Sequence, residues 1–166
     1  LKHLTISHYA LIEHLDIDIA SGFSVITGET GAGKSIMLGA LNLLLGGRAD
    51  AKAIQTGERK CMVEAAFNIK HAGLEPFFAN NDIDFDPQEC IVRREVMQSG
   101  KSRAFINDTP VTAAKLKEIG ASLIDIHSQH QNLLLRNEHF LIDTLDIMAE
   151  QQDAVSAYKC LYGQCK

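Results

Sequence analysis

Apolar and polar residues alternate along several stretches of the chain, and this period of two predicts half-buried β-strands. The first stretch covers 15–19, where leucine and isoleucine alternate with aspartate, and a shorter strand is expected before it at 4–6. Three later stretches show the same alternation or a β-rich composition: 61–69, 90–97 and 103–106. Turn residues follow the last one, as Asn107-Asp108 and then Thr109-Pro110. We therefore expect an antiparallel β layer in the second block of the chain.

Two further stretches are apolar without clear alternation and are expected to form buried strands. One is 23–27, which follows the Ser21-Gly22 turn and leads directly into a glycine-rich loop. The other is 122–126, which precedes a polar loop at 127–131.

Apolar residues recur at spacings of three and four in the segments expected to be helical. The clearest is 34–45, which Gly46-Gly47 should end. A short helix and a loop are expected within 73–87, and a helix over 112–119 with Gly120 as its stop. Helical spacing also continues from Asn137 to the end of the chain.

The loop at 28–35 reads Gly-Glu-Thr-Gly-Ala-Gly-Lys-Ser and matches the phosphate-binding pattern GxxxxGK[ST] at every fixed position. Its glycines allow backbone N–H groups to point at phosphate oxygens, and the following helix adds its positive N-terminal end. Lys34 is expected to contact the β- and γ-phosphates of ATP, and the Ser35 hydroxyl to ligate Mg²⁺. The predicted nucleotide-binding residues are Gly28, Glu29, Thr30, Gly31, Ala32, Gly33, Lys34, Ser35 and Ile36.

A complete ATPase site also needs an acidic metal ligand, usually at the end of a buried strand. No apolar strand of this sequence ends in Asp-Glu or Asp-Asp. Asp125 lies inside the apolar run at 123–126 rather than after it, so we do not assign it this role.

The chain has 166 residues, of which 46% are hydrophobic and 22% charged, as expected for one globular domain. Its formal net charge of -5 argues against a surface that is basic throughout, so any contact with nucleic acid must be local. The four cysteines form no CxxC pair and are expected to be reduced, as in a cytosolic protein. No apolar run is long enough to cross a membrane. The chain begins without Met and stops within a predicted helix, so we expect it to be part of a longer protein.

Several segments together resemble the N-terminal ATPase lobe of the RecN family of bacterial DNA repair proteins. RecN proteins are relatives of the SMC chromosome proteins within the ABC ATPase superfamily. The resemblance runs along essentially the whole chain, and the segments at 44–50 and 125–131 make it specific. The segments that carry it are 10–13, 27–35, 44–50, 102–107 and 125–131.

The resemblance implies an α/β P-loop NTPase lobe of the ABC/SMC type, with a mixed β-sheet, an antiparallel β layer and the root of a coiled coil. The lobe would span 1–148 and the coiled-coil helix would start at 149–166, while the C-terminal lobe is absent. Gln129, in the Q-loop around 127–131, would help to ligate Mg²⁺ and act in catalysis with Lys34, and Gln131 is a second candidate. ATP would be sandwiched between two heads of a homodimer, in a cytoplasmic, nucleoid-associated protein that binds DNA in double-strand-break repair. This chain alone would hydrolyse ATP hardly at all.

Basic residues are densest at 93–103, where Arg93, Arg94, Lys101 and Arg103 are expected to occupy a solvated face of the β layer, with contact to the DNA backbone as the alternative. Arg48 is a separate candidate for contact with DNA or with the partner lobe. A zinc site is a weak alternative, because zinc needs four converging ligands. The residues that suggest it are His127, His130, Cys160 and Cys165.

Two other function classes remain open from the residues alone. One is a self-contained P-loop kinase for a small metabolite, which requires an arginine-rich lid and an acidic metal ligand within this chain. The other is a non-catalytic module whose nucleotide pocket serves only for dimerisation.

Overall fold

The computed structural model describes residues 1–27, 33–126, 148–149, 155, 158 and 161–162. Contacts between Cα atoms divide the chain into two units, Leu1–Asp125 and Ile126–Lys166. In the second unit, the rings of Tyr158 and Tyr162 stack with their centroids 6.0 Å apart, as expected one helical turn apart. The fold described below is that of the first unit.

Six strands of the first unit form one sheet in the order β2-β1-β3-β4-β5-β6, and every neighbouring pair is antiparallel. The predicted antiparallel β layer is therefore confirmed, whereas the described residues form no mixed sheet. The strands are β1 (His3–Tyr9), β2 (Ile12–Asp18), β3 (Lys60–Phe67), β4 (Cys90–Met97), β5 (Ser102–Ile106) and β6 (Thr109–Val111).

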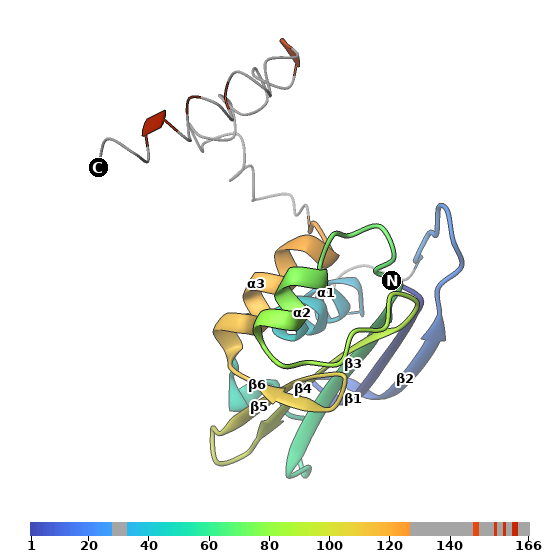
Figure 1. The fold of residues 1–166 in the computed structure, drawn as a ribbon. Helices are drawn as coiled ribbons and strands as arrows, with labels where there is room; N and C mark the ends of the chain where they lie inside the picture. Colours follow the sequence, from blue (N-terminus) through green and yellow to red (C-terminus); the bar gives the residue numbers. More distant parts are fainter. Residues whose placement is uncertain (28–32, 127–147, 150–154, 156–157, 159–160, 163–166) are drawn as a thin grey trace. The chain divides into compact units, whose positions relative to one another are not determined.

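Three helices lie on one side of this sheet (Figure 1), so one sheet face is covered and the other faces outward. They are α1 (Gly33–Leu44), α2 (Glu75–Asn80) and α3 (Ala113–Leu123), and a short 3-10 helix spans Ala51–Ala53. The strands alternate accordingly: β3 and β4 bury every second residue. The largest fully buried side chains of the core are Phe67, Phe78, Leu4, Ile6, Leu44, Ile69, Ile106, Leu116, Ile119, Val63, Val92 and Val96.

The end of α1 is fixed by its glycines, as the sequence predicts. Gly46 adopts φ +87°, and the amide groups of Gly46 and Gly47 donate to the carbonyl groups of Leu43 and Asn42. A Cβ atom added to Gly46 would lie only 2.8 Å from the carbonyl oxygen of Ala113 in α3. Glycine at this position therefore both ends α1 and lets it approach α3 closely.

The predicted helix stop at Gly120 is wrong, because α3 continues through this residue to Leu123. A Cβ atom added to Gly120 would lie 3.2 Å from the Cβ atom of Leu45. The glycine thus serves a close contact between α3 and Leu45, the residue after α1, rather than a helix end. As a result, the predicted buried strand at 122–126 is also wrong, since Ser122 and Leu123 belong to α3 and 124–126 form no strand.

The predicted buried strand at 23–27 is wrong as well. These residues form no strand, and Phe23 and Val25 are 93% and 67% exposed. A strand needs a hydrogen-bonding neighbour, and none of the six strands pairs with this segment.

The turn after β5 is shorter than predicted. Asn107 and Asp108 have φ values of 46° and 60°, which the two central residues of a type I′ hairpin turn require. Thr109 and Pro110 already belong to β6, where Pro110 lies opposite Phe105 on the edge strand. Proline is tolerated there because an edge strand does not need all its amide donors.

Candidate nucleotide-binding site

The N-terminus of α1 is the part of the predicted phosphate site that the structure describes. Gly33 is the first residue of this helix, and Lys34 and Ser35 follow in its first turn with exposed side chains. Ile36 is half-buried. Gly28, Glu29, Thr30, Gly31 and Ala32 lie outside the described residues, as does Gln129.

This helix end has the chemistry of an anion site. The first amide groups of a helix have no acceptor within the helix, and the helix dipole places partial positive charge there. The first turn of α1 contains no acidic residue that would oppose an anion. The residues present therefore fit a phosphate group, with the Lys34 ammonium as an additional positive charge and the Ser35 hydroxyl as an oxygen ligand for Mg²⁺.

The position of α1 is set by the packing of its inner face. Ala40, Leu43 and Leu44 are buried, and the helix packs against β1, β3 and β4. A Cβ atom added to Gly39 would lie 3.0 Å from the Tyr9 hydroxyl oxygen, so glycine allows α1 to lie close to the end of β1. The helix is thus anchored by its later turns, while its first turn remains accessible.

The basic residues predicted as one cluster are split between the two faces of the sheet: Arg103 lies opposite Glu95 and so shares the face of Arg93, whereas Arg94 lies on the other face. Arg93 and Arg94 are neighbours on β4 and therefore point to opposite faces of the sheet. Lys101 and Arg103 are exposed, in the β4–β5 connection and on β5, and Arg48 is exposed after α1.

Arg93 on the outward face is already compensated by acidic groups. Its Nη1 and Nη2 lie 3.4 Å from Glu64 Oε2 and 3.0 Å from Asp108 Oδ1, and its guanidinium lies 4.6 Å from the centre of the Phe105 ring. These ion pairs reduce the positive charge that it offers to DNA.

Arg94 departs from the prediction of a solvated face, because it is only 4% exposed. The sequence contained a signal for this: positions 90, 92, 94 and 96 share one face of β4, and the other three carry Cys or Val. The prediction of a solvated face for Arg94 is wrong because it relied on the density of charge and not on this alternation.

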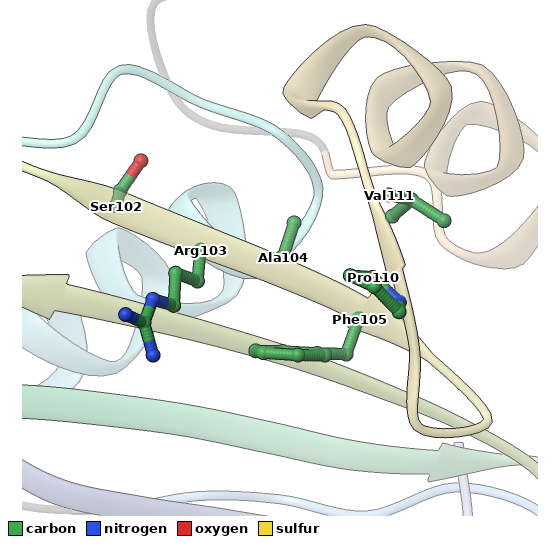
Figure 2. Close-up of a pocket in the computed structure, with 6 residues that line it drawn as sticks. All are labelled: Ser102, Arg103, Ala104, Phe105, Pro110 and Val111. Atoms are coloured by element: carbon green, nitrogen blue, oxygen red, sulfur yellow. The ribbon is translucent and has the colours of Figure 1, made fainter.

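A hollow of about 400 Å³ lies at the β5–β6 edge of the sheet. Figure 2 shows Ser102 and Ala104 pointing to one side of β5 and Arg103 and Phe105 to the other. The remaining lining residues are Pro110 and Val111. Arg103 is its single charged lining residue, and no described residue of the phosphate loop contributes to it.

Other chemistry is limited in the part of the chain that the structure describes. Cys61 and Cys90 are buried free thiols, and burial raises the pKa of both, that of Cys90 to about 12. They are therefore protonated and unsuited to act as nucleophiles. Among the described residues there is no group of three metal-ligating side chains, and no helix is long and apolar enough to cross a membrane.

Two of the relatives that match this chain by sequence are RecN proteins. The chain is 39% identical to DNA repair protein RecN of Vibrio cholerae over 162 residues, which cover 98% of this chain and 29% of that protein. It is also 39% identical to DNA repair protein RecN of Bacillus subtilis over 163 residues, which cover 96% and 28%. The chain thus spans less than a third of the length of these relatives.

Solved structures confirm the fold of an SMC head lobe. A chain from a study of ATP-driven dimerisation and DNA-stimulated activation of SMC ATPases matches with a TM-score of 0.61 and 22% identity, over 87% of this chain and 98% of the other. The SMC head domain from Thermotoga maritima matches with a TM-score of 0.54 and 18% identity, over 71% of this chain and 41% of the other. The model of the RecF/RecN/SMC N-terminal domain matches residues 1–128. On this match, the chain belongs to the RecF/RecN/SMC N-terminal domain family.

Proposed function

We propose that this chain is the N-terminal nucleotide-binding lobe of a RecN-type ATPase that acts in DNA double-strand-break repair and recombination. The observation that carries the proposal is the accessible N-terminus of α1. It begins with the Gly33-Lys34-Ser35 end of the GxxxxGK[ST] motif and has no acidic residue in its first turn. Family membership and the RecN relatives support the biological role.

In this proposal the residues of the chain bind and orient ATP. Lys34 and the amides of the loop at 28–35 neutralise charge on the β- and γ-phosphates, while Ser35 and Gln129 hold Mg²⁺. Mg²⁺ would supply charge neutralisation at the phosphate oxygens. Catalysis is then mainly positioning and electrostatic stabilisation.

The lobe would act as half of a site, completed by parts of the protein outside this chain. The apolar segment at 23–27 supports this, because its exposed side chains have no partner strand among the described residues. We propose a lobe spanning 1–148, a coiled-coil helix that starts at 149–166, and a C-terminal lobe that supplies the missing acidic metal ligand. Engagement of two such heads would enclose ATP, in a cytoplasmic, nucleoid-associated protein that binds DNA.

The test compares nucleotide binding and hydrolysis by the 166-residue chain and by the full-length protein. We expect the chain alone to bind ATP weakly and to hydrolyse it hardly at all, and the full-length protein to turn over ATP. Lys34→Ala should abolish binding in both. Lys52→Ala is the matched control, because Lys52 is also an exposed lysine but lies in the 3-10 helix after α1.

Two outcomes would contradict the proposal. Robust turnover by the 166-residue chain that Lys34→Ala abolishes would show a self-contained site. Unchanged nucleotide affinity in Lys34→Ala would show that the N-terminus of α1 is not where phosphate binds.

A further inference from the structure

Arg94 lies on the covered face of the sheet among apolar side chains. It shares this face of β4 with Cys90, Val92 and Val96, all of which are buried. Across the sheet it lies opposite Val63 of β3 and Ala104 of β5. Only 4% of its surface remains exposed.

The guanidinium of Arg94 has no counter-charge in the described part of the chain. Its Nε atom is buried without a hydrogen-bond acceptor, and no described carboxylate lies within ion-pair distance. Its neighbour Arg93 also has a buried Nε atom without an acceptor, but its two Nη atoms have acidic partners. Burial lowers the pKa of Arg94. An arginine nevertheless keeps its charge in a protein, so the charge is buried rather than removed.

Buried charges in folded proteins are almost always paired, because an uncompensated charge in an apolar layer is strongly destabilising. We propose that Arg94 is one half of an ion pair between lobes, and that its partner is an Asp or Glu carboxylate in the second lobe of the full-length protein. The inference rests on the proposed function in one respect, namely that a second lobe completes this one.

Charge balance and chain length support a carboxylate from the rest of the protein as the partner. The side chains opposite Arg94 are apolar and offer no second positive charge, so a single carboxylate balances the guanidinium. The relatives are more than three times as long as this chain, which covers 29% and 28% of two of them. In a protein of that length, the carboxylate would come from the part that this chain does not cover.

The experiment measures hydrogen exchange of the β4 amides without nucleotide, in the 166-residue chain and in the full-length protein. Each is studied as wild type, Arg94→Met, Arg94→Lys and Arg93→Met. In the chain alone, Arg94→Met removes an unpaired charge, and exchange should slow by about tenfold. In the full-length protein the same change leaves a buried carboxylate unpaired, and exchange should become faster by on the order of 100-fold. Arg94→Lys, which keeps the charge, should fall between wild type and Arg94→Met in the full-length protein.

The proposal depends on this reversal of sign. A change in the same direction in both proteins would overturn it, because Arg94 would then act through packing or through this chain alone. If the effect in the 166-residue chain depended on protein concentration, the carboxylate would come from a second copy and the second-lobe assignment would be wrong. Arg93→Met should change exchange little in either protein. Failure of ATP binding with the sign reversal intact would remove the proposed nucleotide site and leave the ion pair standing.

Discussion

The two faces of the six-stranded sheet differ in how their charged residues are compensated. On the outward face, Arg93 lies between Glu64 and Asp108, and the Nζ atom of Lys60 lies 3.4 Å from Glu95. On the covered face, Arg94 has no acidic partner among the described residues. Two arginines that are adjacent in sequence therefore have opposite electrostatic environments.

The comparison shows on which face charges have acidic partners among the described residues and on which face a charge has none. The ion pairs of the outward face are partly exposed to solvent, so each should contribute little to stability. The covered face carries the packing energy of the lobe, and its buried charge, Arg94, has no acidic partner among the described residues. Substitutions on the two faces should therefore differ greatly in size.

The largest difference is expected from truncating one apolar residue on each face of β3. Phe67 is buried on the covered face, and Phe67→Ala should reduce the free energy of unfolding by about 3–5 kcal/mol. Met62 is only partly buried on the outward face, and Met62→Ala should cost less than about 1 kcal/mol. Urea unfolding followed by circular dichroism measures both. Equal losses would show that the two faces do not differ in packing, and the comparison would fail.

The same two faces explain which elements the sequence predicts well. The stretches at 61–69, 90–97 and 103–106 correspond to β3, β4 and β5, because helices cover only one face and leave a clear alternation. The helix predicted at 34–45 corresponds to α1, because only one face of this helix is buried and its apolar residues therefore recur at helical spacing. Continuous apolar runs carry no such signal. The segment at 23–27 is unpaired, and that at 122–126 is partly helical, because pairing and packing decide their structure.

The candidate site is predictable to a similar extent. The motif at 28–35 identifies its chemistry. Of the strand and helix predicted on either side of the loop, the helix is confirmed, with Gly33, Lys34 and Ser35 at the start of α1. Charge density predicted one basic cluster, but the alternation of β4 places Arg93 and Arg94 on opposite faces of the sheet. Gln129 lies outside the described residues and stays a prediction.

A smaller effect is expected from the ion pairs of Arg93. Arg93→Met should reduce the free energy of unfolding by about 0.2–1 kcal/mol, because Asp108 is highly exposed and Arg93 and Glu64 are each partly exposed. Raising the salt concentration to 1 M should reduce the difference further, since exposed charges are screened. Chemical unfolding at low and high salt measures both values. A loss of several kcal/mol that salt does not change would place Arg93 among the buried charges and remove the contrast with Arg94.

The smallest effect is expected at His3, the first residue of β1, which lies opposite Asp18 of β2. The hydrogen bond of its Nδ1 atom with Asp18 Oδ1, at 2.7 Å, is the main cause that raises the pKa of the imidazole, and the negative charges of Asp16 and Asp18 add to it. The protonated pair stabilises the fold below about pH 6.5, where the unfolded imidazole is also protonated. This contribution is lost as the pH rises through the folded pKa.

An NMR titration of the His3 ring should give a midpoint above the unfolded value, and Asp18→Asn should lower it. Glu13→Gln, which removes an exposed charge from the same strand without touching the hydrogen bond, should leave the midpoint nearly unchanged. If Asp18→Asn left the midpoint unchanged, the acidic groups of the outward face would not be coupled to their basic neighbours, and its charges would be uncompensated like Arg94.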